Sequence, residues 1–196
     1  MMPLGAGVSK EQANWAGFGS SDGAFWCCYG TAIESFAKLN DNLYFEAAEA
    51  AAAAVPELWV SQLFVPSEVQ WAAGGATVKL QSSLSADRCD TLHVTIELAA
   101  LSGGGACFGA GGCALSVRLP SWADGAASAV ELHHDGSVER LAPDGDGAME
   151  VGRFVRIARA WAAGDSVRLR LGLYAYLEPL NDWRVRYAAS YALVYG

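Results

Sequence analysis

Hydrophobic and polar residues alternate along most of the chain after residue 57, with the period of strands that bury one face. Turn-forming pairs such as Gly74-Gly75, Asp135-Gly136 and Gly164-Asp165 interrupt this alternation at fairly regular intervals. Short strands separated by turns predict an antiparallel β-sandwich, with a tight hairpin at Asp135-Gly136. The predicted strands are residues 58–65, 76–84, 91–99, 114–119, 129–133, 147–157, 166–173 and 186–195.

One short helix is predicted ahead of the strands. Thr31 and Glu34 have the spacing of a capping box, in which each side chain satisfies an unpaired backbone N–H group. Asn40-Asp41 predicts the end of the helix. About two turns of helix do not stand alone in water, so this element needs a packing partner. Its apolar face, at i, i+3 and i+4 spacing, consists of Ile33, Phe36 and Ala37.

The pattern divides the chain into two unequal parts and predicts a mainly β protein. Residues 1–46 form the first part, of which residues 1–22 read as loop or disordered lead-in. Residues 47–56 are an alanine-rich run without amphipathic pattern and read as a linker. Residues 57–196 form the predicted β-sandwich domain.

Composition and charge exclude several classes of partner. The formal net charge of −8 over 196 residues argues against a nucleic-acid partner, because phosphate binding needs clustered Lys and Arg. Arg168 and Arg170 alternate and are predicted to share one solvated strand face. The first residues lack the basic and apolar regions of a signal peptide, and residues 47–55 are too short to span a membrane. The cellular location stays open.

Two adjacent cysteines, Cys27 and Cys28, lie directly before the predicted helix. The partial positive charge of a helix N-terminus favours thiolates, which are nucleophiles and soft metal ligands. An apolar plug is the alternative interpretation, and residue types alone favour neither. The chain has five cysteines; Cys107 and Cys113 are expected to be unpaired thiols in a loop insertion rather than a disulfide, and Cys89 to be a core or loop thiol.

The histidines and tryptophans are predicted to be structural. His133 and His134 are adjacent in a predicted strand and point to opposite faces, which disfavours joint binding of one metal ion. His93 lies in a strand pattern and is expected to be structural or exposed. Sandwiches bury most of their tryptophans, so the core is favoured over a sugar-stacking surface for four of them: Trp71, Trp122, Trp161 and Trp183.

Several blocks of the chain resemble sequence motifs of one known family and occur in the same order as in that family. The first block runs from Gly23 through Phe25-Trp26-Cys27-Cys28-Tyr29-Gly30-Thr31 to Leu39 and resembles the motif that closes the catalytic barrel of the β-L-arabinofuranosidases, glycoside hydrolase family 127. The later blocks are Leu43-Tyr44-Phe45, residues 58–67, Arg118-Leu119-Pro120-Ser121-Trp122, Arg159 to Asp165, Tyr187-Ala188 and residues 191–196.

The resemblance implies a domain order and a chemistry. The family has an (α/α)6 barrel followed by a β-sandwich, so residues 1–46 would be a short helical remnant of that barrel, and the rest of the barrel would be a missing N-terminal partner. It also implies that Cys27 is nucleophile and zinc ligand, that Cys28 is a second zinc ligand, and that Tyr29 lines the substrate cleft. In the family, a Glu-x-Cys segment supplies the other two zinc ligands and a further glutamate is the general acid; neither has a match in this sequence.

The preferred hypothesis is therefore a fragment of a retaining glycoside hydrolase that cleaves terminal L-arabinofuranosyl residues from glycans and is inactive as an isolated chain. The alternative is a non-catalytic carbohydrate-binding or accessory β-sandwich module. A redox protein with a vicinal Cys27–Cys28 disulfide is the least favoured interpretation, because such a ring is strained.

Overall fold

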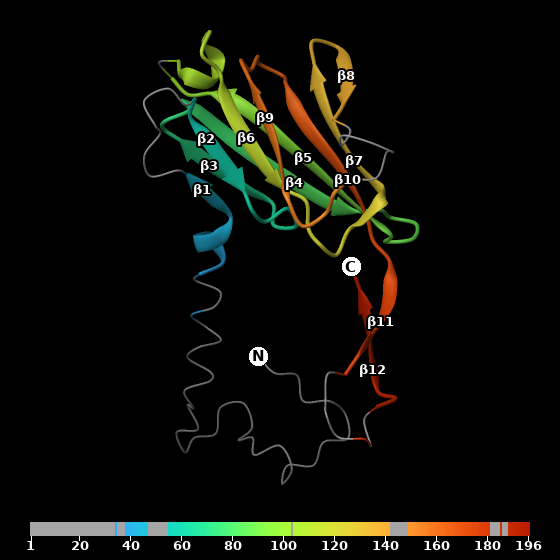
Figure 1. Cartoon of the computed structure of the whole chain (residues 1–196). Coiled ribbons are helices and arrows are strands. Elements are labelled where there is room, and N and C mark those ends of the chain that lie inside the picture. The colour runs from blue at the N-terminus through green and yellow to red at the C-terminus, as the bar shows by residue number, and fades with distance from the viewer. Residues whose placement is uncertain are drawn as a thin grey trace. The chain divides into compact units, whose positions relative to one another are not determined.

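The computed structural model describes residues 34, 38–46, 55–102, 104–141, 149–180, 185 and 188–196. The described part of the chain is mainly β, as predicted, and residues from Leu43 to Gly196 form one compact unit, distinct from a first unit that ends at Asn42. Figure 1 shows its strands, with β2, β6 and β9 crossing the longer strands β4, β5 and β10. None of the described helices is long and apolar enough to cross a membrane.

The smaller layer of the sandwich has four strands, in the order β1-β2-β6-β9. Strands β2 and β6 are parallel, whereas the other pairs of this sheet are antiparallel. The strands are β1 (Tyr44–Glu46), β2 (Glu57–Val60), β6 (Cys113–Arg118) and β9 (Phe154–Arg159).

The larger layer has six antiparallel strands, in the order β3-β4-β5-β10-β7-β8. A separate two-stranded ribbon, β11 with β12, follows it in the chain. These strands are β3 (Ser67–Trp71), β4 (Ala76–Leu84), β5 (Thr91–Ala100), β7 (Asp124–His134), β8 (Ser137–Arg140), β10 (Ser166–Gly172), β11 (Ala175–Pro179) and β12 (Tyr191–Tyr195).

One hydrophobic core lies between the two layers, and alternation along the strands builds it. Along β4, β5 and β10, most inward positions are aliphatic and most of the outward positions between them are polar. Arg168 and Arg170 are both exposed on the outer face, as predicted from their alternation. The largest side chains buried to below two per cent exposure come from both sheets and the loops between them: Val60, Leu63, Val78, Leu80, Val94, Ile96, Leu115, Val117, Leu119, Val130, Val167 and Leu171.

The hairpin predicted at Asp135-Gly136 is confirmed. It joins β7 and β8, and both turn residues have positive φ, 49° for Asp135 and 72° for Gly136. This is the backbone conformation that a two-residue hairpin turn of the type I′ family requires. The predicted turn at Gly164-Asp165 is also present, because the Asp165 N–H donates to the Ala162 carbonyl at 3.1 Å before β10 begins.

Four strands lie outside the predicted strand ranges: β1, β3, β8 and β11, of which β8 follows the predicted hairpin turn. Strand β1 has three residues, too few to show a period, and it exists because Tyr44–Glu46 pairs with residues 58–60 of β2. The predicted strand 58–65 ends at Val60, where the chain turns away and the Ser61 N–H donates to the Leu43 carbonyl at 2.9 Å. The domain boundaries after residues 46 and 56 stay a prediction.

The predicted helix falls mostly outside the described residues. Glu34 is helical, and its carbonyl accepts a hydrogen bond from the Lys38 N–H at 3.1 Å. The predicted stop at Asn40-Asp41 lies within a 3-10 helix, η1 (Leu39–Asn42), so the helical turns reach slightly further than the sequence indicated. The alanine-rich run lies outside the described residues except at its end.

Two glycine-containing loops, the one between β3 and β4 and the one between β5 and β6, meet at one end of the sandwich. A Cβ atom on Gly75, which has a φ of +62°, would lie 2.2 Å from the Gly105 Cα, so this approach tolerates no side chain. Backbone hydrogen bonds join the same loops, since the Cys107 N–H donates to the Gly74 carbonyl at 3.0 Å. The contact positions the short 3-10 helix η2 (Ala106–Phe108).

Candidate functional site

The residues predicted to carry the chemistry, Cys27, Cys28 and Tyr29, lie outside the described residues, as does Trp183. Their predicted roles as nucleophile, zinc ligands and cleft residue stay predictions. The described part of the chain does show what the remaining cysteines, the histidines and the other aromatic residues do.

The expectation that Cys107 and Cys113 are unpaired was wrong. They form a disulfide across a sequence separation of six residues, and both are fully buried. The pairing follows from the tertiary fold: η2 turns the glycine-rich loop back so that Cys107 comes within 4.5 Å, Cα to Cα, of the first residue of β6. Cys89 is the free cysteine of the described residues and is exposed in a loop, as one of its two predicted placements allowed.

His93 is exposed, whereas His133 and His134 interact with different carboxylates. His133 Nε2 lies 3.2 Å from Glu131 Oε2, and His134 Nδ1 lies 4.0 Å from Asp165 Oδ1. Among the described residues, no group of three His, Cys, Asp or Glu side chains is close enough to hold a metal ion. The described part of the sandwich therefore offers no zinc centre of its own.

Trp71 and Trp161 belong to the core, as predicted. They are 2% and 3% exposed, and each indole N–H has a hydrogen-bond acceptor. Trp71 Nε1 donates to Glu46 Oε1 at 3.1 Å, and Trp161 Nε1 donates to the Cys113 carbonyl at 3.4 Å. Both side chains are thus structural. Trp122 is only half-buried: it packs against the core and also lines a pocket.

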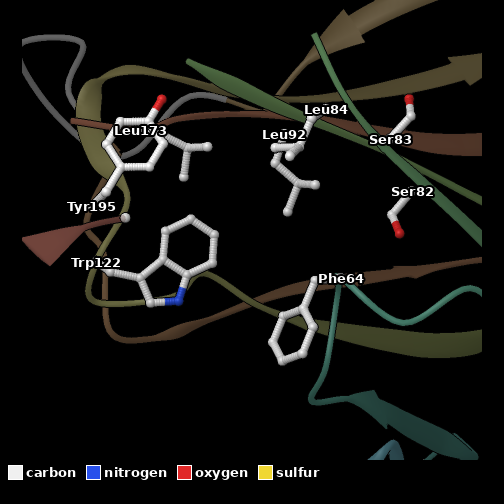
Figure 2. A pocket seen from close by; sticks show the side chains of 9 residues that line it. Phe64, Ser82, Ser83, Leu84, Leu92, Trp122, Leu173 and Tyr195 are labelled. Atoms are coloured by element: carbon white, nitrogen blue, oxygen red, sulfur yellow. The ribbon is translucent and has the colours of Figure 1, made fainter. Parts of the chain in front are cut away.

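That pocket lies at one end of the sandwich and has a volume of about 410 Å³. Figure 2 shows the rings of Phe64, Trp122 and Tyr195 around one open space, with Leu84 and Leu92 across from Phe64. Loops after β2 and β6 supply Phe64 and Trp122, and β12 supplies Tyr195. The remaining lining residues are Ser82, Ser83, Leu173 and Gly196.

Sequence reasoning did not single out this pocket. Phe64, Trp122 and Tyr195 lie in three separate blocks, residues 58–67, 118–122 and 191–196, each of which resembles the same family. That shared feature was a usable signal. Only the fold, however, brings the three side chains to one pocket, because Trp122 and Tyr195 follow Phe64 by 58 and 131 positions in the sequence.

A polar cluster on the outer face of the small sheet centres on Glu57. Ser116 Oγ donates to Glu57 Oε1 at 2.5 Å, and Arg156 Nε donates to Glu57 Oε2 at 3.1 Å. Partial burial raises the pKa of Glu57, but the hydrogen bonds from Ser116 and Arg156 and the positive charge of Arg156 together hold it below its ordinary value. Glu57 is thus a charged partner in the sheet rather than a proton donor.

The family model of the GH127 middle domain, described as β-L-arabinofuranosidase, matches residues 58–173, more than half of the chain. The chain belongs to the GH127 β-L-arabinofuranosidase family. The match covers the sandwich from β2 to the end of β10, so the described body of the molecule corresponds to the middle domain of the GH127 architecture. The resemblance stated from the sequence is thereby confirmed.

Solved structures support the fold. A GH127 β-L-arabinofuranosidase from Geobacillus stearothermophilus T6 aligns with 88% of this chain at 21% identity and a TM-score of 0.57. A structure described as a glycoside hydrolase aligns with the whole chain at 12% identity and a TM-score of 0.60. The present chain spans 23% and 28% of the lengths of these two proteins. No curated protein matches the chain.

Proposed function

We propose that this GH127 chain is the part of a retaining glycoside hydrolase that supplies the thiolate nucleophile, Cys27, and the β-sandwich that follows the catalytic barrel. The carrying observation is the family match over residues 58–173, with Cys27-Cys28 a short distance ahead of it in the chain. The substrate class that follows from the family is a glycan with terminal L-arabinofuranosyl residues.

In the proposed reaction, the Cys27 thiolate attacks the anomeric carbon, a C–S bond forms and the glycosidic C–O bond breaks. The general acid, a glutamate of the family for which this sequence has no matching residue, protonates the departing oxygen. Water then attacks the same carbon, the C–S bond breaks to return the thiolate, and the carboxylate that donated its proton in the first step takes a proton from the water, so the sugar is released with retention. Tyr29, beside the cysteine pair, lines the cleft in this proposal.

The chemistry of the donors fits zinc, because two adjacent thiolates are soft ligands that suit this ion. Bound zinc would keep the thiols deprotonated. Cys27 and Cys28 are the residues that would hold it, and four ligands are the usual number in a closed site. Cys107 and Cys113 are joined in a disulfide, so they do not complete the set.

The test combines metal binding with activity. We expect Co²⁺, a spectroscopic probe for zinc–thiolate sites, to give a thiolate charge-transfer band with the 196-residue chain that disappears in the double variant Cys27→Ser, Cys28→Ser. The matched control is Cys89→Ser, which removes an exposed free thiol and leaves the band unchanged. An unchanged band in the double variant would contradict the proposed ligands.

The chain is also proposed to be inactive by itself, because the acid and the other ligands are not matched in it. We expect no release of L-arabinose from an aryl L-arabinofuranoside by the isolated chain. Release at a rate above that of the double cysteine variant would overturn this part of the proposal.

A further inference from the structure

The pocket lined by Phe64, Trp122 and Tyr195 forms where the inner face of the large sheet extends beyond the small sheet that covers it. Along β4, alternate residues face the core, and Leu80 is 1% exposed. Four residues further on the same face, Leu84 is 53% exposed, although its partner in β5, Leu92, is buried. The floor of the pocket is therefore a piece of core surface open to solvent.

Two of the three rings that surround this floor, those of Trp122 and Tyr195, are held in place. One side of the Trp122 ring packs against the core, and the other side lines the pocket. The Tyr195 hydroxyl donates a hydrogen bond to the Cys89 carbonyl at 2.5 Å, which fixes the direction of its ring. Phe64 is 56% exposed, so a ligand can cover it. Preorganised rings lose little conformational entropy when a ligand binds.

The lining is uncharged. Among the described residues that line the pocket there is no Lys, Arg, His, Asp or Glu, and the polar side-chain groups are the hydroxyls of Ser82, Ser83 and Tyr195 and the indole N–H of Trp122. Phosphorylated and carboxylated ligands need a charged partner, usually Arg or Lys, so this lining does not select them. A volume of about 410 Å³ falls within the usual range for small-molecule sites.

We propose that this pocket is a carbohydrate-binding site for one sugar residue of a neutral glycan. A sugar ring offers apolar C–H groups on its faces for aromatic rings and hydroxyls on its rim for the Trp122 indole N–H and for the hydroxyl of Ser82, which lies on the same face of β4 as Leu84. The pocket offers both in one place. The choice of a glycan as occupant rests on the proposed function, in which the substrate is an arabinofuranosyl glycan.

The test is a titration of the 196-residue chain with L-arabinose and with an arabino-oligosaccharide, followed by tryptophan fluorescence and by NMR. We expect a saturable change that Trp122→Ala abolishes and Phe64→Ala weakens by about tenfold, which corresponds to about 1.4 kcal/mol. The matched controls are Trp59→Ala and Phe154→Ala. These two residues are 40% and 38% exposed, and they contact each other outside the pocket, at 4.9 Å between ring centroids.

Far-UV circular dichroism establishes that each variant is folded, and Phe64→Ala, at an exposed position, keeps the test decisive if Trp122→Ala does not fold. Absence of any saturable response, or a response that Phe64→Ala leaves unchanged, would overturn the proposal. Binding of the apolar dye anilinonaphthalene sulfonate without a response to sugar would also overturn it and would indicate that an apolar protein segment covers the pocket.

The double variant Cys27→Ser, Cys28→Ser distinguishes the proposal of a sugar-binding pocket from the proposal of a thiolate nucleophile. We expect it to bind sugar with the same affinity as the original chain. Sugar binding together with a failed cobalt test would remove the thiolate proposal and keep the pocket, whereas the reverse result would remove only the pocket.

Discussion

The sandwich and the β11–β12 ribbon have strands of similar composition but opposite environments. In the sandwich, Leu115 of β6 and Val167 of β10 are fully buried between two layers. In the ribbon, Leu177 of β11 and Leu193 of β12, which are directly paired, are 63% and 75% exposed. The difference shows that an apolar strand becomes part of a core only when a second layer covers it.

The same contrast predicts two levels of stability within one compact unit. An isolated pair of strands is marginal in water, whereas a two-layered sandwich of four and six strands buries a continuous core. We therefore expect the ribbon to open at lower free energy than the sandwich. Amide hydrogen exchange, which reports local opening, distinguishes the two regions in each of the experiments below.

The largest effect is expected from truncating the core. Leu115→Ala removes a fully buried side chain from the centre of the small sheet and should lower the free energy of unfolding by about 3 kcal/mol, from lost burial and the cavity left behind. Urea denaturation measures this. The matched variant Leu193→Ala makes the same chemical change in the ribbon, where we expect less than about 0.5 kcal/mol.

Equal losses of stability in these two variants would break the contrast between sandwich and ribbon. It would mean that the ribbon is covered in solution, for example by a second molecule. Repeating the denaturation at several protein concentrations would reveal such association, because the stability of an oligomer depends on concentration.

A smaller effect is expected from opening the disulfide at the edge of the sandwich. The double variant Cys107→Ser, Cys113→Ser should lower the free energy of unfolding by about 2 kcal/mol, because the bond restricts a short loop in the unfolded chain. Thermal unfolding with and without a reducing agent measures the same change in the original chain. Cys89→Ser, at an exposed free thiol, is the control and should change little.

We expect the loss of the disulfide to increase exchange in β6 and in the η2 loop but not in β12. If reduction left the unfolding temperature unchanged, the two cysteines would not be paired in solution, and the expectation from sequence of unpaired thiols would stand instead.

The smallest effect is expected from the Glu57 cluster, and it depends on pH. The pKa of Glu57 is lowered on folding, so its contribution to stability is present above the ordinary value of 4.5 and is lost as the pH falls through the lower folded-state pKa. Glu57→Gln should cost about 1 kcal/mol at neutral pH, and its deficit relative to the original chain should close in acid.

Urea denaturation across this pH range tests the sign of that effect. Glu150→Gln is the matched control, because Glu150 pairs with Arg153 and both side chains are strongly exposed. A Glu57→Gln deficit that grew as the pH fell would contradict the inferred direction of the pKa.

Local patterns predicted the body of the sandwich well. Alternation placed β4 at residues 76–84 and β5 to within one residue, because alternate side chains enter the core along most of each strand. Short strands such as β1, which exist through pairing with distant residues, left no such period. The disulfide was misjudged for a related reason: only the turn of η2 brings the two sulfur atoms together.

The sequence by itself determined the mainly β fold, the family and the position of Cys27-Cys28 ahead of the sandwich, because period, turn residues and motif blocks are local properties. Only the tertiary structure decided where the core ends. Leu80 and Leu84 share one face of β4 and are the same amino acid, yet one is buried and the other forms the floor of a pocket. That outcome depends on how far the opposite layer reaches, and no local pattern records the length of a partner that lies elsewhere in the chain.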